Sequence, residues 1–218
     1  VNASASLAGT SLSTGGKVNA GAYAQQVSTI NGADSGNYSL SSYTTPSNTY
    51  TVSQLALLGT LSNGSSVYGS ALNPGSVSLS NVVSGDQVQV GSVTVNTAGN
   101  LSGAGKLKAG SYTGIESVGS ALTGADAGNY SFNGLTGDYT VSQLALTGVA
   151  IASGSSVYGS VVTPGAVSFT NVVAGDVVNA SASLAGTSLS TGGKVNAGAY
   201  AQQVSTINGA DSGNYSLS

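Results

Sequence analysis

The 218-residue sequence contains no cysteine, no histidine and no arginine. Without cysteine, the chain can form neither a disulfide framework nor a thiolate metal site. Without histidine, it lacks the most common general base and the most common transition-metal ligand. A net charge of -3 without arginine argues against nucleic-acid binding, because neutralisation of phosphates supplies most of that affinity. We therefore expect a structural protein and not an enzyme, with no cofactor and no nucleic-acid partner.

Charge and long apolar runs are scarce as well. Charged residues make up only 5% of the sequence, so solubility must depend on serine, threonine, asparagine and backbone hydration. The longest apolar runs, such as residues 149–152, are far shorter than the roughly 20 residues that a membrane-spanning helix needs. No membrane span is therefore expected within this sequence.

The sequence repeats itself. Residues 1–41 recur without a difference at 178–218, and the stretch Tyr-Thr-Val-Ser-Gln-Leu-Ala-Leu occurs at both 50–57 and 139–146. Such self-similarity predicts a tandem array, here of two alternating repeat types, A and B. The predicted divisions are 1–52 (the C-terminal part of a B-type repeat), 53–141 (a complete A-type repeat) and 142–218 (a B-type repeat lacking its closing segment). We expect the chain to be a window on a longer array of this kind.

The stretch at 50–57 and 139–146, which we call the border stretch, closes one repeat and opens the next. Its large residues alternate with polar or small ones in each half, which predicts a pair of short strands with one buried face. Burying each leucine would contribute about 2 kcal/mol. The residues expected to pack at the junctions between repeats are Tyr50, Leu55, Leu57, Tyr139, Leu144 and Leu146.

The rest of the chain also predicts β-structure. The 33 glycines separate short alternating segments at 76–79, 88–90, 93–95, 130–132 and 180–184, and no stretch carries a sustained helical period. We predict an all-β fold, built from small two-layer β-sandwich-like modules arranged end to end in an extended rod or filament.

Several residues recur in step with the repeat and serve as landmarks. Tyr68 and Tyr158 each precede a glycine, so each ring is expected to lie over bare backbone with its hydroxyl on a loop carbonyl. Asp34, Asp126 and Asp211 are expected to form Asx-turns ahead of the following tyrosine. The full set of landmarks is Tyr68, Tyr158, Asp86, Asp176, Tyr130 and Tyr215.

The order of the landmarks resembles a known family. Val-Tyr-Gly-Ser at 67–70, Gly-Asp at 85–86, Ala-Gly-Ser-Tyr at 109–112, Gly-Asn-Tyr at 128–130 and Gly-Asp-Tyr-Thr-Val at 137–141 are similar to the MBG domain of the Tyr-Gly-X type and to the related YDG domain. Such domains occur in tandem in large bacterial surface and secreted adhesins, often of the filamentous haemagglutinin type. The resemblance implies an extracellular, cell-surface location and a part in cell adhesion and biofilm, with mucin or glycan binding as the alternative role. It supplies no catalytic residues.

Other interpretations stay open at this point. Asp34 and Asn37 could contribute to a Ca²⁺ site, and Lys106 or Lys194 could form an isopeptide bond. Tyr43, in a loop with Pro46, is the best candidate for a glycan contact. Thr-Gly-Gly-Lys at 14–17 and Gly-Ala-Gly-Lys at 103–106 match catalytic and phosphate-binding motifs too weakly to predict either activity. The expected partners are neighbouring repeats of the same chain, identical filaments pairing laterally through sheet edges with few charges, and, in the alternative, surface glycans.

Overall fold

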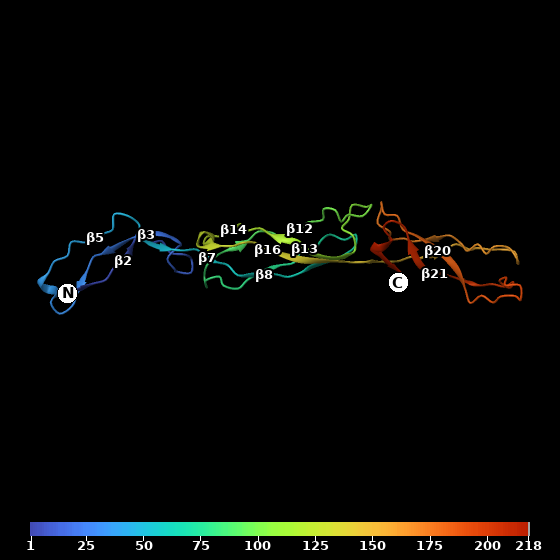
Figure 1. Cartoon of the computed structure of the whole chain (residues 1–218), viewed down its shortest axis with the longest axis horizontal. Coiled ribbons are helices and arrows are strands. Elements are labelled where there is room, and N and C mark those ends of the chain that lie inside the picture. The colour runs from blue at the N-terminus through green and yellow to red at the C-terminus, as the bar shows by residue number, and fades with distance from the viewer. Residues whose placement is uncertain (218) are drawn as a thin grey trace. The chain divides into compact units, whose positions relative to one another are not determined.

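The computed structural model describes residues 1–217, and this part of the chain is all-β, as predicted (Figure 1). It contains no α-helix within those residues, only three short 3-10 turns: η1 (Ser35–Asn37), η2 (Ala127–Asn129) and η3 (Ser212–Asn214). Each turn follows an aspartate and precedes a tyrosine of the repeating Asp-x-Gly-Asn-Tyr motif. No helix within 1–217 is long and apolar enough to cross a membrane.

The strands are short, because glycine and polar turns interrupt the apolar alternation. Up to residue 90 they are β1 (Asn2–Ala3), β2 (Ser6–Ala8), β3 (Gly21–Val27), β4 (Ile30–Asn31), β5 (Tyr43–Thr44), β6 (Tyr50–Val52), β7 (Leu55–Ala56), β8 (Gly59–Leu61), β9 (Gly64–Val67), β10 (Val77–Leu79) and β11 (Gln89–Val90). Beyond it they are β12 (Thr94–Val95), β13 (Gly110–Val118), β14 (Leu122–Thr123), β15 (Tyr130–Ser131), β16 (Leu135–Ser142), β17 (Leu144–Leu146), β18 (Ala150–Ile151), β19 (Val167–Ser168), β20 (Asn179–Ala185), β21 (Ala201–Asn208) and β22 (Tyr215–Leu217).

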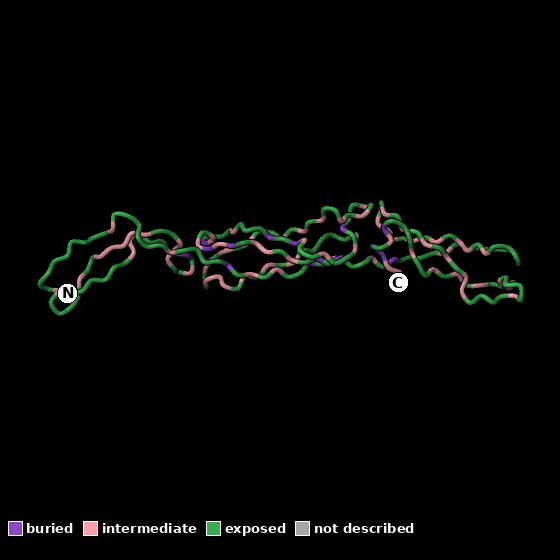
Figure 2. Tube along the Cα trace, in the orientation of Figure 1, coloured by how far each residue is buried: buried purple, intermediate pink, exposed green. Residues whose placement is uncertain are grey.

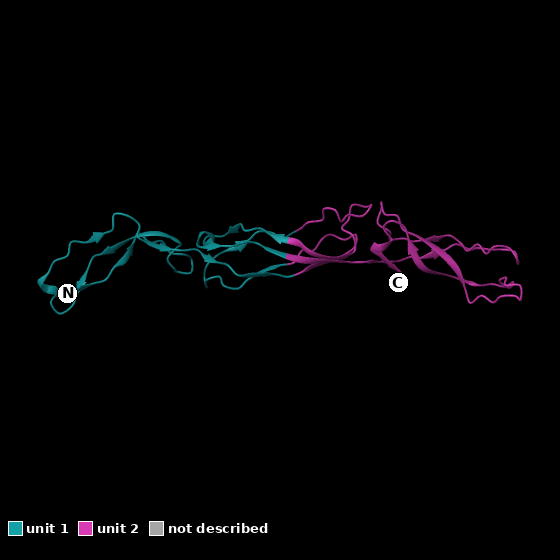
Figure 3. Ribbon diagram, in the orientation of Figure 1, with its two compact units in different colours: residues 1–62, 76–94, 117–136 teal, residues 63–75, 95–116, 137–218 magenta. Residues whose placement is uncertain are grey.

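The chain divides into two compact units (Figure 3). Unit 1 comprises Val1–Ser62, Ser76–Thr94 and Ser117–Thr136, and unit 2 comprises Asn63–Gly75, Val95–Glu116 and Gly137–Ser218. Each unit therefore collects segments from more than one sequence repeat. Compactness and sequence repetition are different properties, so the repeat boundaries at 52/53 and 141/142 stay a prediction.

Unit 1 is held together by small antiparallel pairings and one parallel pairing. β3 pairs antiparallel with β2, β5 and β6, and β8 pairs antiparallel with β10. β7 pairs parallel with β15, placing Leu55 opposite Tyr130. The second half of the border stretch is thereby joined to the strand that follows the η2 turn.

Unit 2 repeats that parallel pairing. β17 pairs parallel with β22, placing Leu144 opposite Tyr215. β16 lies between β13 and β9 in a four-stranded sheet of order β12-β13-β16-β9, and its pairing with β9 is parallel. β20 and β21 form a long antiparallel hairpin with a register shift between Ala180 and Ala182. Both halves of the border stretch are thus strands in each copy, as the alternation predicted.

Burial is concentrated in one small cluster per unit, while most of the chain is exposed or half-buried (Figure 2). The clusters are small because few large apolar residues are available and many positions are glycine or serine. The buried residues of the unit 1 cluster are Leu57, Val118, Tyr130 and Phe132, and those of the unit 2 cluster are Tyr68, Leu107, Tyr139, Val141, Leu146 and Tyr215. Tyrosines therefore supply much of the core, and their hydroxyls require polar partners.

Candidate functional site, a repeated carboxylate joint

Each unit contains a polar cluster beside its apolar core, which we call a carboxylate joint. The first joint, in unit 1, comprises the loop 13–17 with Asp86, Asp126, Asn129 and Tyr130. The second joint, in unit 2, comprises the loop 102–106 with Asp176, Asp211, Asn214 and Tyr215, and adds Tyr68. The residues of the two joints occupy matching positions in the repeat.

The loop of each joint is a tight turn closed by its own backbone. In the first joint, the Ser13 amide donates to the Lys17 carbonyl at 2.7 Å and the Gly16 amide donates to the Ser13 carbonyl at 2.9 Å. In the second, the Ser102 amide donates to the Lys106 carbonyl at 2.8 Å. The two amides at the tip of each loop are left to donate elsewhere. Two adjacent outward-pointing amides form a natural site for carboxylate oxygens.

In the first joint, both tip amides donate to aspartates far away in the sequence. The Thr14 amide donates to Asp126 Oδ1 at 2.9 Å, and the Gly15 amide donates to Asp86 Oδ1 at 2.8 Å. The Thr14 hydroxyl also donates to Asp126, whose Oδ2 accepts a further hydrogen bond from the Gln87 amide at 2.7 Å. The two carboxylates therefore hold the loop by its backbone.

The second joint repeats these contacts with different loop residues. The Gly103 amide donates to Asp211 Oδ1 at 3.1 Å, and the Ala104 amide donates to Asp176 Oδ1 at 3.0 Å. Asp211 Oδ2 accepts from the Val177 amide at 2.9 Å, as Asp126 does from Gln87. Because the loop contributes backbone amides, Thr-Gly in one joint and Gly-Ala in the other serve equally well.

Tyrosine hydroxyls complete the coordination of one aspartate in each joint. Tyr130 donates to Asp86 Oδ2 at 2.6 Å, and Tyr215 donates to Asp176 Oδ2 at 2.6 Å. Each of these hydroxyls also accepts a backbone amide, from Val83 at 3.1 Å and from Val173 at 3.0 Å. The tyrosine that begins the strand after each 3-10 turn thus connects the apolar core to the carboxylates.

The second joint has an additional tyrosine. The Tyr68 hydroxyl donates to Asp176 Oδ2 at 2.5 Å and lies 2.6 Å from Ser102 Oγ. Its ring packs edge-on against Tyr215, with centroids 5.3 Å apart and an interplanar angle of 73°. The prediction that this hydroxyl contacts a loop carbonyl was wrong, because the nearby aspartate is a stronger, charged acceptor.

Amide side chains add a matched pair of contacts at each joint. Asn129 Oδ1 accepts the Ala20 amide at 2.7 Å, and Asn214 Oδ1 accepts the Ala109 amide at 2.9 Å. From the border stretch, Gln54 donates to the Gly128 carbonyl at 3.0 Å, and the corresponding glutamine, Gln143, donates to the Gly213 carbonyl at 2.9 Å. Within residues 1–217, no buried side-chain nitrogen or oxygen lacks a hydrogen-bond partner.

The hydrogen bonds shift the pKa values of three of the aspartates downward. Hydrogen bonds from Ser13 and Tyr130 lower the pKa of Asp86, and the Gln87 amide followed by Thr14 lowers the pKa of Asp126. Burial alone would raise the pKa of Asp176, but its hydrogen bonds from Tyr215, Tyr68, Ala104 and Ser102 outweigh that effect and lower it. These carboxylates are therefore held ionised by their donors.

The tyrosines are shifted in the opposite direction. Burial, followed by the hydrogen bond to Asp176, raises the pKa of Tyr68 to about 12. The same two causes, in the same order, raise the pKa of Tyr215. Burial and the hydrogen bond to Asp86 raise the pKa of Tyr130. Each hydroxyl thus remains a proton donor to its carboxylate over a wide range of pH.

The aspartates of the Asp-x-Gly-Asn-Tyr motif do not form the predicted Asx-turns. Asp34, Asp126 and Asp211 each precede a 3-10 turn but make no side-chain hydrogen bond to it. Asp126 and Asp211 direct their carboxylates to distant amides instead. A local turn assignment cannot anticipate this, because the competing donors come from segments far away in the chain.

The structure separates the predicted junction residues into two groups. Leu57, Tyr139 and Leu146 are buried and Leu144 is half-buried, whereas Tyr50 is 47% exposed and Leu55 is also exposed. Burial at the junction was therefore wrongly predicted for Tyr50 and Leu55. The strand that contains Tyr139 lies between two others, but β6 pairs with β3 alone among the described strands, so Tyr50 is uncovered.

Leu55 is exposed for a related reason. It lines a pocket of about 150 Å³ together with Ser13, Asp86 and Tyr130, which correspond to the residues that Tyr68 contacts in the second joint. No tyrosine from unit 1 occupies the equivalent place. Tyr158, the repeat counterpart of Tyr68, is itself 58% exposed, whereas Tyr68 is only 1% exposed.

Sequence reasoning missed some of the residues that matter most. The loops 13–17 and 103–106 were considered only as weak catalytic or phosphate-binding motifs, and Asn129 and Asn214 were noticed only as parts of a landmark. Their matching positions in the repeat were the available signal. No three Asp or Glu side chains within 1–217 come together in a group that could hold a metal. Tyr43 is exposed at the start of β5.

Comparison with protein-family models, curated proteins and solved structures finds no match to this chain.

Proposed function

We propose that this chain is a structural tandem-repeat segment of a large secreted or cell-surface bacterial adhesin. In this proposal, small β-sandwich-like modules follow one another end to end and form an extended extracellular filament or stalk. The filament serves cell-cell and cell-surface attachment and contributes to a biofilm matrix. The observation that carries the proposal is the carboxylate joint, which is built twice from matching repeat positions.

The chemistry of the joint suits a mechanical role. Hydrogen bonds to ionised carboxylates are roughly twice as strong as those between neutral groups. Each joint combines several of them, from two loop amides, a tyrosine hydroxyl and further backbone amides, with a small apolar core. All of these contacts are made without cysteine or histidine, neither of which the sequence contains.

The same geometry supports a role other than catalysis. Asp86, Asp126, Asp176 and Asp211 already accept hydrogen bonds at both carboxylate oxygens. Their donors are backbone amides and tyrosines that also hold the fold together, so a substrate would have to break the joint to reach them. We propose that the chain has no catalytic residue and needs no cofactor.

The extracellular location is proposed from the resemblance to MBG and YDG domains and from the composition. Neighbouring repeats of the same chain are the proposed partners, with lateral pairing between identical filaments as a further contact. A sheet edge with few charged residues is open to such pairing.

Single-molecule pulling of the full chain tests the proposal. Asp211→Asn removes one carboxylate from the second joint, so we expect a lower unfolding force for the corresponding event. Hydrogen bonds to a charged group contribute about 1.5–3 kcal/mol each, which is enough to be seen. The matched control is Asp34→Asn, since Asp34 holds the same place in the repeat but is exposed and lies outside both joints. Equal unfolding forces for the two variants would contradict a mechanical role for the joint.

Glycan binding is the competing function. The exposure of Tyr38, Tyr43 and Tyr50 favours it, because exposed aromatic rings are typical contacts for sugars. A glycan array probed with the full chain, and with Tyr43→Ala as the comparison, distinguishes the two functions. Binding that depends on Tyr43 would favour a recognition module, and the adhesin filament predicts no such dependence.

A further inference from the structure

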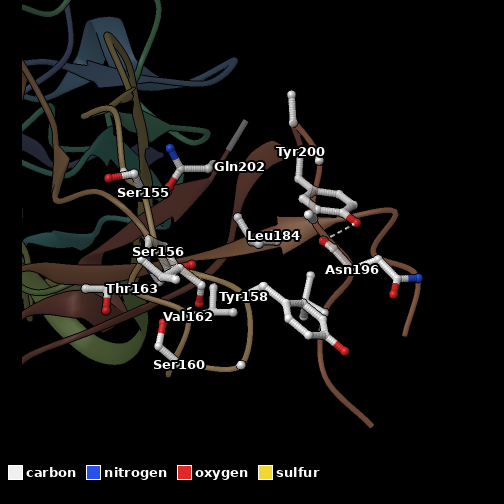
Figure 4. Close-up of a pocket in the computed structure, with 18 residues that line it drawn as sticks. Ser155, Ser156, Tyr158, Ser160, Val162, Thr163, Leu184, Asn196, Tyr200 and Gln202 are labelled. Atoms are coloured by element: carbon white, nitrogen blue, oxygen red, sulfur yellow. Dashed lines mark hydrogen bonds between the residues drawn. The ribbon is translucent and has the colours of Figure 1, made fainter. Parts of the chain in front are cut away.

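The chain has two open surfaces. At the matching position of the other repeat, each of these surfaces is covered by residues of the same chain. The first is a groove of about 360 Å³ in unit 2, bounded by residues 154–157 and by the segment 195–202 (Figure 4). In Figure 4, Ser155 and Ser156 lie on one side of the groove, and Leu184 and Tyr200 lie on the other. The second is the pocket of about 150 Å³ beside Asp86 and Tyr130 in unit 1.

Both walls of the groove have sequences that pair with a Tyr-Thr-Val strand in another part of the chain. The Gly-Ser-Ser-Val of residues 154–157 is also the sequence of β9, which pairs parallel with β16 in the register Gly64 to Tyr139. Residues 198–204 have the same sequence as β3, which pairs antiparallel with β6 in the register Tyr23 to Tyr50. A groove with these two walls is therefore shaped for a strand of the sequence Tyr-Thr-Val-Ser.

The buried tyrosine of the complete copy shows what such a strand gains. Tyr139 is fully buried, and its hydroxyl accepts the Asn73 amide at 2.9 Å. Tyr50, which starts the same Tyr-Thr-Val-Ser sequence, is half exposed where it stands. Insertion between 154–157 and 198–204 would bury it as Tyr139 is buried.

The pocket beside the first joint fits the other exposed tyrosine. In the second joint, the Tyr68 ring lies beside Ser102, Asp176 and Tyr215. Their repeat counterparts Ser13, Asp86 and Tyr130 all line the open pocket. Tyr158 directly follows the wall 154–157, just as Tyr68 directly follows β9. A strand pairing at the groove would therefore bring Tyr158 to this pocket.

We propose that these surfaces are the two halves of a head-to-tail interface between copies of this chain. Residues 178–217 of one copy replace the identical residues 1–40 of the next copy, and strand 50–53 of that next copy enters the groove. Tyr158 of the first copy then enters the pocket beside Asp86 of the second. The exchange is a strand swap combined with strand addition.

The energetics favour the exchange, because the displaced and the incoming segments have the same sequence. Within one copy, β3 contacts β5 and β6, and the loop 13–17 contacts the rest of the first joint. After the exchange, residues 198–204 and 190–194 of the other copy make the same contacts. The parallel pairing along 154–157 and the burial of two tyrosines are added. This net gain opposes the loss of translational freedom on association. The interface is heterologous and does not close, so it generates linear chains.

Head-to-tail association of this kind does not require the proposed adhesin role. A chain that stayed monomeric would leave the joints and their mechanical test unaffected.

The test begins with sedimentation velocity of the full chain after refolding from urea at high protein concentration. We expect a concentration-dependent ladder of oligomers. Tyr158→Ala should weaken association at least about 10-fold, as for a buried aromatic anchor. Because Tyr158 is exposed within its own copy, this variant keeps its fold. Tyr38→Ala, which alters another exposed tyrosine outside both surfaces, should associate as the original chain does.

Cysteine pairs identify the register, since the chain has no cysteine of its own. Thr51 should lie opposite Ser155 of the other copy, as Thr140 lies opposite Ser65 within the chain. Mixing Thr51→Cys with Ser155→Cys chains should give a covalent dimer under mild oxidation, while Ser39→Cys with Ser155→Cys should not. A monomer at every concentration, an unchanged association of Tyr158→Ala, or equal cross-linking of both pairs would overturn the proposal. The last result would indicate lateral edge pairing in its place.

Discussion

At the scale of single residues, the carboxylates organise this protein by contacts that are not local. The loop tips, the Gly-Asp turns and the Asp-x-Gly-Asn-Tyr motifs lie far apart in the sequence, yet each joint brings one of each together. Asp126 and Asp211 show the pattern most clearly, because each accepts amides from two separate segments. A glycine two residues before each of these aspartates makes the arrangement sterically feasible.

Gly124 and Gly209 are the glycines on which the two joints depend. Each has a φ of 112°, and a Cβ on either would lie 2.4 Å from a carbonyl oxygen, that of Gln87 or Val177. Gly124→Ala should therefore destabilise the protein by at least about 2 kcal/mol, from backbone strain and the clash together. Urea denaturation followed by circular dichroism measures this loss.

The control for this change lies four residues further on. Gly128 has no positive φ, and a Cβ added to it would have no atom of another segment within 4 Å. Gly128→Ala should therefore change the stability by less than about 0.5 kcal/mol. Similar losses for both variants would show that the conformation of Gly124 is not what supports the joint.

At the scale of elements, one glutamate on β13 fixes the hairpin that contains β9. Glu116 is fully buried, and its Oε2 and Oε1 accept the Gly64 amide at 2.9 Å and the Gly75 amide at 2.8 Å. In the B-type repeat, a different side chain accepts the corresponding glycine amide. There, Gln202 Oε1 accepts the Gly165 amide at 2.7 Å. A side-chain acceptor for this glycine amide is thus present in both repeat types.

Removing this acceptor should loosen the hairpin. Glu116→Leu leaves the buried Gly64 amide and the half-buried Gly75 amide without this partner. A buried amide without a partner costs about 1–3 kcal/mol, and the half-buried amide should cost less. Glu116→Gln retains one acceptor oxygen, so its stability should lie between that of Glu116→Leu and that of the original chain. Urea denaturation of the three proteins gives the order, and a Glu116→Leu variant as stable as the original chain would contradict this assignment.

The sequence predicted the elements better than their partners. Alternation at 76–79 and 180–184 correctly predicted strands, which are β10 and β20. Alternation says which residues share a face but not which strand lies alongside, so the exposure of Tyr50 could not be anticipated. Glu116 gave no local signal either, because its role depends on a hairpin about 50 residues away that only the fold brings close.

At the scale of the whole molecule, stability should depend on pH only at the extremes. The pKa values of Asp86, Asp126 and Asp176 lie below their ordinary value of 3.8, so their contribution is present above that pH and is lost as the pH falls through the lowered values. The pKa of Tyr68 is raised from 10.0 to about 12, so its contribution is present below pH 10.0 and is lost as the pH rises from there to about 12.

The melting temperature should therefore be flat between about pH 5 and 9, because no histidine titrates there, and should fall at both ends. Circular dichroism across the pH range measures this profile. Tyr68→Phe should reduce the alkaline fall without abolishing it, since Tyr130 and Tyr215 also have raised pKa values. A melting temperature that changed steeply near pH 7 would show that groups outside the joints control stability.

The repetition of the chain supplies an internal control for the joint as a whole. Residues 190–194 have the same Ser-Thr-Gly-Gly-Lys sequence as 13–17 and the same closed loop, with the Ser190 amide donating to the Lys194 carbonyl at 2.7 Å. Among residues 1–217, however, no hydrogen-bond acceptor lies at the Thr191 or Gly192 amide. The two loops thus have the same sequence, but only the loop at 13–17 is held in a joint.

Site-resolved amide hydrogen exchange in a dilute, monomeric sample therefore shows whether the joint holds its loop. If the carboxylates hold the loop by hydrogen bonds, the Thr14 and Gly15 amides should exchange at least about 100-fold more slowly than the Thr191 and Gly192 amides. Equal exchange rates in the two copies of this loop would show that the carboxylates do not hold it.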